Sequence, residues 1–132
     1  MEQENTILKK YFDGMTIESL IQPIATANLE QKRVIDIINN IEKAMMEYAS
    51  KITYTQMRNI YAILLSADDV IGLHKVRPKI AYIQARLDKP EAKDVTIFIL
   101  NLMKIVTKTE QVASFKELME TMVAFHKQYS KN

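Results

Sequence analysis

Glycine and proline are scarce in this chain, and their scarcity limits the folds that it can adopt. Two glycines and three prolines occur among 132 residues, and Asp13-Gly14 is the single dipeptide typical of a β-hairpin. Apolar residues recur at helical spacing in every long segment. The sequence therefore predicts an all-α fold in which residues 1–132 form one domain. That domain is a bundle of about five main helices, with one or two short N-terminal helices within residues 1–27.

The first half of the chain predicts two short helices and a long one. The first covers part of residues 4–12 and ends near Gly14, and the second follows Thr16 and stops before Pro23. A long helix then runs to about residue 50, with Asn28 as its cap and Gln31 three residues on. Its predicted buried face consists of Val34, Ile38, Ile41, Met45 and Tyr48.

Two capping boxes and a proline predict where later helices begin. Thr53-Tyr54-Thr55-Gln56 fits a capping box, with Ile52 and Met57 at the positions of a hydrophobic staple. This helix is expected to end at Ser66 or Ala67, with a buried stripe of Met57, Ile60, Tyr61, Leu64 and Leu65. Pro90 opens a helix that buries Val95, Phe98, Ile99, Leu102 and Ile105. A second box, Ser114-Phe115-Lys116-Glu117, leads into Leu118, Met122, Phe125 and Tyr129.

Basic residues concentrate in the middle of the chain. Residues 1–50 carry five Lys/Arg and eight Asp/Glu, residues 51–93 carry eight and four, and residues 94–132 carry five and four. The overall charge of +2 therefore hides a middle third of net +4. A basic third in a nearly neutral chain predicts a localised anion-binding surface, and not a protein whose whole exterior coats nucleic acid.

A row of cations around one tyrosine lies in this basic third. Lys75, Lys79, Tyr82 and Arg86 recur at i, i+4, i+7 and i+11, which places them in one stripe along a helix. A second stripe, roughly a quarter-turn away, is apolar and consists of Leu73, Val76, Ile80, Ile83 and Leu87. Because proline inside a helix costs about 3 kcal/mol, the helix can instead start at Pro78. Lys75 and Arg77 would then lie on the preceding loop.

A cationic row with an aromatic residue in its middle can neutralise phosphates and stack a base. The alternative is that the lysines and arginines only solvate an exposed helix face. The eight methionines favour core filling over a promiscuous binding groove.

Several classes of protein are excluded or disfavoured by what the sequence lacks. Without cysteine there is no disulfide, no thiolate zinc site and no cysteine nucleophile. The first residues do not resemble a signal peptide, and there is no run of about 18 apolar residues that could span a membrane. We therefore expect a cytoplasmic protein with no membrane contact.

The sequence contains no recognisable pattern for a catalytic, metal or cofactor site. Neither His74 nor His126 has a carboxylate or a second histidine at i+3 or i+4, so both are expected to be ordinary surface or boundary residues. Asp68-Asp69 is better explained by helix capping than by magnesium binding. Phosphate-loop, dinucleotide-binding and nucleophile-elbow motifs are missing. We expect no cofactor, no small-molecule substrate and no enzymatic activity.

Three segments together resemble a known family. Thr53-x-x-Gln56-Met57-Arg58-x-x-Tyr61 is followed by Arg77-Pro78-Lys79-Ile80-Ala81-Tyr82 and by residues 120–129, which contain Val123-Ala124-Phe125 and Tyr129. This order is similar to that of the small helical subunit of the type III-A CRISPR effector, the Csm complex, over residues 28–132. The family usually continues Ala-Tyr-Ala-x-Gly-Arg, whereas Ala85 replaces that glycine here. Alanine favours a continuous helix, by about 1 kcal/mol relative to glycine.

The resemblance implies a non-catalytic subunit that holds RNA. Several copies would stack into a filament along the duplex of guide RNA and target RNA, beside the backbone and large subunits of the complex. The positions that match and are expected to touch RNA are Arg58, Arg77, Lys79 and Arg86. Lys75 and Tyr82 complete the candidate RNA-binding set.

Each candidate residue also has a structural interpretation. Arg58 could pair with an acid on a neighbouring helix, and Arg77 and Lys79 flank a helix start. Arg86 could favour the dipole at a helix C-terminus, and Tyr82 could either stack on a base or pack under Arg86. Thr53 and Gln56 are assigned to capping and not to RNA contact.

Two other functions remain open at the level of sequence. Residues 53–88 could form two helices around a turn, as in a DNA-binding helix-turn-helix protein, although the acidic Asp68-Asp69 turn disfavours it. A helical adaptor that touches only protein is the second alternative.

Overall fold

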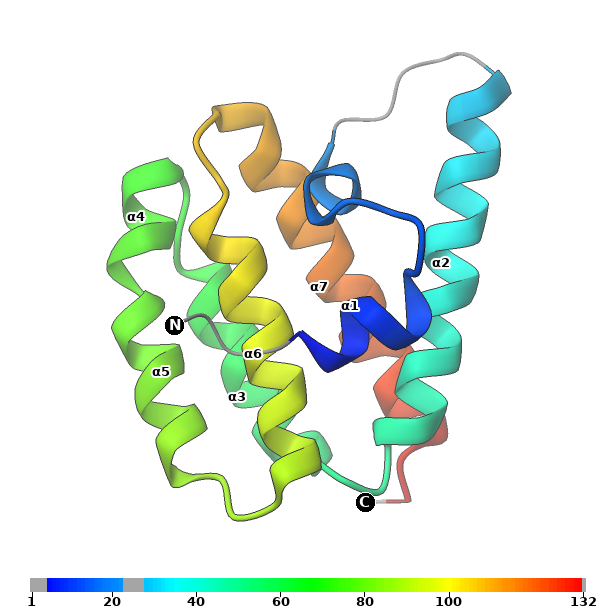
Figure 1. The fold of residues 1–132 in the computed structure, drawn as a ribbon. Helices are drawn as coiled ribbons and strands as arrows, with labels where there is room; N and C mark the ends of the chain where they lie inside the picture. The colour runs from blue at the N-terminus through cyan, green and yellow to red at the C-terminus, as the bar shows by residue number, and fades with distance from the viewer. Residues whose placement is uncertain (1–4, 23–27, 132) are drawn as a thin grey trace.

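A computed structural model describes residues 5–22 and 28–131, and the side chains of residues 28–30 fall outside the description. The chain order is α1 (Thr6–Tyr11), the 3-10 turn η1 (Ile17–Ile21), α2 (Asn28–Tyr48), α3 (Tyr54–Leu65), α4 (Val70–Lys75), α5 (Arg77–Arg86), α6 (Pro90–Lys104) and α7 (Thr109–Tyr129) (Figure 1). The described residues contain no strand, so the predicted all-α class is confirmed.

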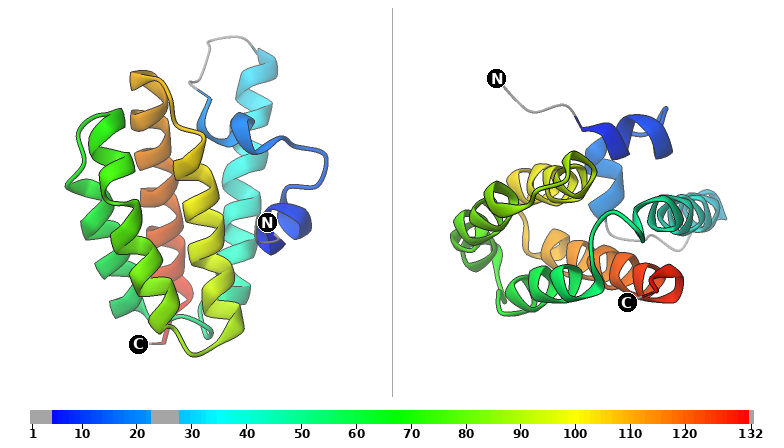
Figure 2. Two further views of the ribbon diagram at one scale, coloured as in Figure 1. Left: turned by 60° about the vertical axis from the view of Figure 1, so that its left-hand side comes forward. Right: turned by 90° about the horizontal axis from the view of Figure 1, so that it is seen from below.

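The long helices stand side by side around a common core. α7 packs between α2 and α3, and α5 packs on α6 and α3. Seen from below, α1 and η1 lie on the side of the bundle between α6 and α2 (Figure 2). The short connections α3–α4 and α5–α6 reverse the direction of the chain, whereas α4 and α5 follow one another in the same direction along one side of the bundle (Figure 1).

Large side chains fill the centre of this bundle. Tyr48, Phe98 and Phe115 are fully buried, as are five of the eight methionines, namely Met45, Met57, Met103, Met119 and Met122. Their burial agrees with the core-filling role predicted for methionine, while Met46 is exposed on α2. The core is therefore continuous from α2 across α7 to α5.

The N-terminal segment contributes to this core. Ile7, Phe12 and Ile21 are buried, and the Phe12 ring stacks on Phe98 with 5.8 Å between ring centroids. The Tyr11 hydroxyl donates to the Glu47 carboxylate, and the Lys10 ammonium lies 2.6 Å from the same group. The hydrogen bonds from Lys10 and Tyr11 lower the pKa of Glu47. The two predicted N-terminal elements are thus present, the second as a 3-10 turn.

The predicted face of the long helix is partly wrong. Ile41, Met45 and Tyr48 are buried as expected, but Ile38 is 40% exposed, and Ile37 and Ala44 are buried instead. Leu65, predicted to be buried on the next helix, is 46% exposed. In both cases the apolar residue lies at the edge of the stripe, where neighbouring helices decide burial. The predicted cap at Asn28 involves a side chain that lies outside the described part of the structure.

The two predicted capping boxes have different outcomes. The backbone N–H of Gln56 donates to Thr53 Oγ1 at 3.1 Å, and the backbone N–H of Thr53 donates to Gln56 Oε1 at 3.0 Å. These two hydrogen bonds confirm the first box. The second is wrong, because α7 begins at Thr109 and Ser114 lies inside it, donating to the Glu110 carbonyl. Gln111 Oε1 accepts from the Lys108 amide at 3.1 Å and supports the earlier start. Val112, buried before the predicted start, extends the apolar face that α7 packs inward.

His126 is fully buried, which contradicts its predicted position at the surface or boundary. Its Nε2 lies 2.7 Å from the Ile52 carbonyl, and its ring stacks on Tyr54 at 6.5 Å. Since a carbonyl only accepts, Nε2 carries the proton, and the buried Nδ1 has no hydrogen-bond partner in the described structure. Burial lowers the pKa of His126 from its ordinary value of 6.5, partly offset by the bond to Ile52.

We predict that Phe12→Ala lowers the free energy of unfolding by about 3–5 kcal/mol, the usual cost of removing a buried phenylalanine ring. Urea unfolding followed by circular dichroism measures the change. Tyr82→Ala is the matched control, because Tyr82 is 63% exposed and should cost little. Equal losses in both variants would mean that α1 does not seal the core.

We also predict that stability falls as the pH drops below about 6.5, because the unfolded chain then binds a proton that folded His126 resists. His126→Gln retains a donor for the Ile52 carbonyl but cannot titrate, so its unfolding free energy should depend less on pH. Chemical unfolding between about pH 8 and about pH 5 tests this. An unchanged dependence in His126→Gln would contradict the assignment.

Candidate nucleic-acid interface

A capped turn sets the direction of the basic segment. Asp69 is the N-cap of α4, and its Oδ1 accepts from the Gly72 amide at 2.7 Å. A Cβ at Gly72 would lie 2.9 Å from that same oxygen, so glycine suits this close approach. The predicted capping role of Asp68-Asp69 is therefore confirmed for Asp69.

The helix is interrupted at a single residue, Val76, shortly before Pro78. α4 ends at Lys75, Val76 lies between the two helices in a helical conformation, and α5 begins at Arg77 with Pro78 in its first turn. Neither sequence alternative is fully correct, since Lys75 lies on a short helix and not on a loop. α5 continues through Ala85 to Arg86, as the replacement of glycine by alanine predicts.

The apolar stripe of this segment anchors it to the bundle. Leu73, Val76, Ile80 and Leu87 are buried, and Ile83 packs against the core while partly exposed. Lys75, Lys79, Tyr82 and Arg86 are exposed. The predicted arrangement, with an apolar stripe docked on the core and a cationic stripe in solvent, is thus present. We call these four exposed residues the basic row.

Arg77 differs from the basic row because it is tied to the fold. His74 Nε2 lies 2.7 Å from the Val106 carbonyl, and Arg77 Nη1 lies 3.1 Å from His74 Nδ1. A guanidinium only donates and a carbonyl only accepts, so Nε2 carries the proton and Nδ1 accepts from Arg77. This chain of two hydrogen bonds joins the start of α5 to the end of α6. Arg77 is half-buried as a result.

Tyr82 and Arg86 form a pair within the basic row. Arg86 Nη1 donates to the Tyr82 hydroxyl at 3.3 Å, and the guanidinium lies 5.7 Å from the ring centroid. Of the two interpretations of Tyr82, contact with Arg86 is therefore present in the structure. The tyrosine ring remains largely exposed and holds the guanidinium near the row.

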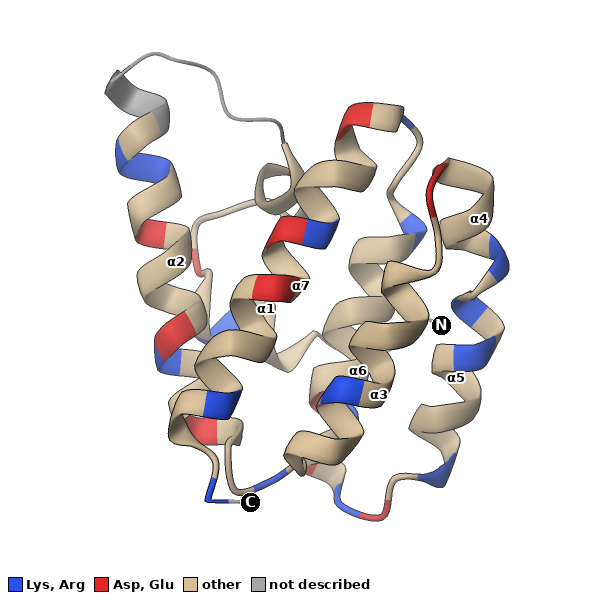
Figure 3. Cartoon of the chain, turned by 180° about the vertical axis from the view of Figure 1, so that it is seen from behind, with Lys and Arg blue, Asp and Glu red and all other residues tan. Residues whose placement is uncertain are grey.

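Arg58 lies apart from the row, on α3. It is exposed, and among the described residues it forms no ion pair or hydrogen bond. The predicted partner acid on a neighbouring helix is thus not found in the part of the chain that the structure describes. Figure 3 shows α3 and α5 on one face of the molecule, each carrying Lys or Arg, with acids on α7 of that face.

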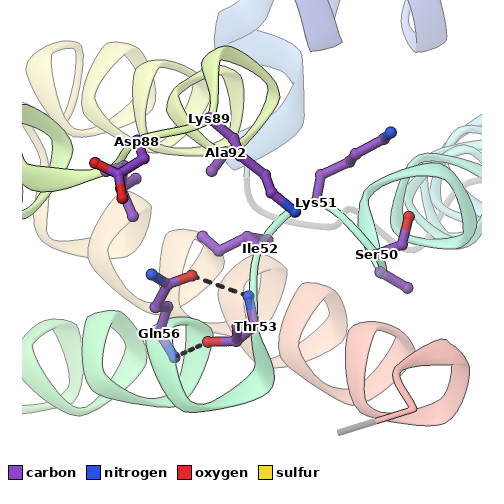
Figure 4. A pocket seen from close by; sticks show the side chains of 10 residues that line it. Ser50, Lys51, Ile52, Thr53, Gln56, Asp88, Lys89 and Ala92 are labelled. Carbon is purple, nitrogen blue, oxygen red and sulfur yellow. Dashed lines mark hydrogen bonds between the residues drawn. The ribbon is translucent and has the colours of Figure 1, made fainter.

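A polar pocket of about 210 Å³ lies beyond the end of α5, between the α2–α3 and α5–α6 connections. Figure 4 shows Thr53 and Gln56 pointing toward one another within it. Lys89 crosses the pocket, while Lys51 extends away from it (Figure 4). Thr53 and Gln56 are therefore committed to capping, as the sequence predicts, and the pocket does not extend the basic row.

The sequence did not predict the His74–Arg77 connection. The signal for it was the i, i+3 spacing of these residues on a helix, but the Val106 partner is remote in sequence.

Within residues 5–22 and 28–131, no three His, Cys, Asp or Glu side chains converge as metal ligands. No helix among the described residues is long and apolar enough to cross a membrane.

The helix-turn-helix alternative has no geometric support. Residues 53–88 form three helices, α3, α4 and α5, where that motif requires two around one turn. α5 also begins at Arg77 with its first turn tied to the bundle through His74. It is thus not a recognition helix with a free N-terminal end.

Comparison with protein families decides which complex this chain belongs to. A model of the Csm2 Type III-A family matches residues 28–132. The chain belongs to the Csm2 family. It is therefore a small subunit of the type III-A CRISPR Csm complex. No curated protein and no solved structure matches it.

The Csm2 match includes all six candidate RNA-binding residues and begins at α2. α1 and η1 thus lie outside the matched region, although their side chains pack in the same core. The family match covers the helices that carry the basic row and the helices that support it.

We predict that substituting Arg77 and substituting Lys79 change the protein's stability by different amounts, although the two residues are close in sequence. Arg77→Ala should lower the unfolding free energy by about 1 kcal/mol, the usual worth of a hydrogen bond, because His74 Nδ1 loses its donor. Lys79→Ala should change it by less than about 0.5 kcal/mol. Urea unfolding compares the two, and equal effects would argue against a structural role for Arg77.

Proposed function

We propose that this chain is a non-catalytic subunit that holds RNA in the Csm complex through the basic row, Arg77 and Arg58. One observation carries the proposal: α5 presents exposed cations and no acid, on a helix whose opposite side is locked into the core. A rigid cationic ridge can follow a phosphate backbone without reorganising. Membership of the Csm2 family supports the proposal, because the family resemblance implies a complex that contains guide RNA and target RNA.

The residue types favour contact with the RNA backbone over recognition of base edges. Lys75, Lys79 and Arg86 are flexible or forked donors suited to phosphate oxygens, whereas the row contains no Asn, Asp or Glu for base recognition. Tyr82 supplies one aromatic surface, which stacks on any base. We therefore expect affinity that depends weakly on sequence and strongly on salt.

The proposed partners follow from this role. Guide RNA and target RNA lie along the basic row, the backbone and large subunits enclose them, and further copies of the chain stack beside one another. The subunit itself contributes position and charge but no reacting group. In this scheme Arg77 both contacts phosphate and fixes the start of α5, while Tyr82 holds Arg86 in place.

We predict that the affinity for a single-stranded RNA of unrelated sequence falls with salt. If the four cations that match the family, Arg58, Arg77, Lys79 and Arg86, each neutralise one phosphate, the slope of log K against log salt should be about −3, at roughly 0.7–0.9 per contact. Fluorescence titration of labelled RNA with the purified chain at several salt concentrations gives the slope. An affinity that is nearly independent of salt would contradict the proposal.

The triple variant Arg77→Glu/Lys79→Glu/Arg86→Glu should lose this binding. Lys32→Glu/Lys43→Glu/Lys131→Glu is the matched control, because it makes the same charge change at exposed lysines on α2 and at the C-terminus. The control should retain a salt-dependent affinity. Equal losses in both variants would point to net charge and not to a defined surface.

If the isolated wild-type chain does not bind RNA, the same variants should be tested in a reconstituted complex. RNA retention that depends on the basic row there would mean that contact needs several copies acting together. RNA retention that is unchanged by the triple variant would instead favour the protein-only adaptor.

A further inference from the structure

A second group of cations around a tyrosine lies where α3 meets α7. Tyr54 and Arg58 have i, i+4 spacing on α3, so they share one side of that helix. The Lys127 ammonium of α7 lies 4.4 Å from the centroid of the Tyr54 ring. Arg58 and Lys127 are exposed, and Tyr54 is half-buried. We call Tyr54, Arg58 and Lys127 the α3–α7 patch.

The core beneath the α3–α7 patch holds it in place. His126 is fully buried, its ring stacks on Tyr54, and its Nε2 lies 2.7 Å from the Ile52 carbonyl. These contacts join the C-terminal end of α7 to the start of α3, where the Thr53–Gln56 capping box fixes the first turn. A ligand of the patch would therefore not have to order the backbone that carries its cations.

The positive charge of the patch is not neutralised within the described part of the chain. Among residues 5–22 and 28–131, neither Arg58 nor Lys127 forms an ion pair. α3 contains no Asp or Glu, and neither does the end of the chain from residue 121 onward. Burial and then the charge of Glu120 raise the pKa of Tyr61, so acid first approaches α3 about one turn beyond Arg58.

The cations that lie over tyrosine rings in the described structure differ in whether an acid neutralises them. Lys10 lies 5.5 Å from the centroid of the Tyr11 ring but 2.6 Å from the Glu47 carboxylate, so this cation ties α1 to α2. The other two pairs, one in the basic row and one in the α3–α7 patch, have no carboxylate partner among the described residues. The patch therefore repeats the chemistry of the basic row, in which a cation beside an aromatic surface remains available to an anion.

The patch and the basic row lie on different sides of α3. Tyr61, about one turn along from Arg58 on the same side of the helix, lines a small gap against α7. Gln56 instead lines the pocket beside the α5–α6 connection. The exposed residues of α3 and its C-cap between these two sides carry no charge; they are Thr55, Asn59, Ala62 and Ser66. In Figure 3, α3 stands between α7 and α5, so a phosphate backbone that follows α5 runs past the patch and not over it.

We propose that the α3–α7 patch is a second RNA-binding surface, which holds a stretch of phosphate backbone other than the one on the basic row. Arg58 and Lys127 contact phosphate oxygens, while the Tyr54 ring keeps the Lys127 ammonium in place. Arg58 thus acts with Lys127 and not with the basic row. The inference rests on the proposed RNA-binding function and adds Lys127 to the residues that contact RNA.

Two separate surfaces on one rigid chain make the affinity depend on the length of the RNA. An RNA long enough to reach both surfaces gains affinity, because the second contact forms within the same complex. An RNA that fills only the basic row gains nothing from the patch. The length of the RNA is therefore the variable that separates the two surfaces.

Titration of labelled single-stranded RNAs of about four and about 16 nucleotides tests this on the full-length chain, since these lengths span the usual range of single-strand site sizes. Arg58→Glu/Lys127→Glu should weaken binding of the long RNA by about tenfold or more. It should also make the slope of log K against log salt shallower by about 1.5, for two lost contacts. The affinity of the same variant for the short RNA should equal that of the wild type.

Two controls separate this contact from general effects of charge and stability. Lys32→Glu/Lys43→Glu makes the same charge change at exposed lysines of α2 and should keep the affinity for both RNAs close to that of the wild type. Lys127 also lies in the last turn of α7, where a cation favours the helix dipole, so urea unfolding should establish that each variant is folded. A patch variant that loses no more affinity for the long RNA than the control overturns the proposal. Equal losses for both RNAs would mean one continuous site and would also overturn it.

The variant Arg77→Glu/Lys79→Glu/Arg86→Glu distinguishes failure of this inference from failure of the proposed function. If it loses both RNAs while the patch variant matches its control, the proposed function stands and the second surface is wrong. If only the patch variant loses RNA, the patch binds RNA and the role proposed for the basic row is wrong.

If no form of the isolated chain binds RNA, the same variants should be compared in a reconstituted complex. A patch variant that assembles into the complex but retains less RNA than its control supports the second surface. RNA retention that equals that of the control overturns it. A patch variant that no longer assembles points to a protein partner on this surface and also overturns the inference.

Discussion

Burial of the apolar side of α4 and α5 controls where every cation of the basic segment can lie. A helix is rigid about its own axis, so fixing Leu73, Val76 and Ile80 in the core leaves no rotational freedom for the residues between them. That constraint turns Lys79, Tyr82 and Arg86 toward solvent, and the contact between Tyr82 and Arg86 lies within the exposed row. The break at Val76 adds only a small offset, because its conformation remains helical.

Local signals were sufficient to predict much of the fold and of the candidate site. The Thr53–Gln56 box, the proline start of α6 and the two stripes around Ile80 all depend on residues a few positions apart. The errors depend on neighbours that are distant in sequence. His126 is buried with its Nε2 satisfied by the carbonyl of Ile52, 74 residues away, and Leu65 is exposed at the edge of the α3 stripe.

The same distinction applies to individual site residues. Sequence spacing placed Arg77 with Lys79 and Arg86 as equivalent cations, but the structure assigns it a partner in His74, which is held by Val106. A charge that positions α5 through a hydrogen bond to His74 is chemically unlike one that stands free in water. Reversing the charge at Arg77 therefore perturbs both the cationic surface and the hydrogen bonds that hold the start of α5. Reversing the charge at Lys79 perturbs the surface alone.

The exposed cations of the basic row suit a nucleic-acid partner better than a partner that offers only surface ion pairs. A nucleic-acid backbone offers one negative charge per nucleotide and releases condensed counterions when it is neutralised. The counterion term is missing from a protein–protein contact of exposed ion pairs, which salt weakens without a comparable entropic gain. In the proposed RNA contact the cations therefore supply most of the affinity, and Tyr82 adds a surface that stacks on any base.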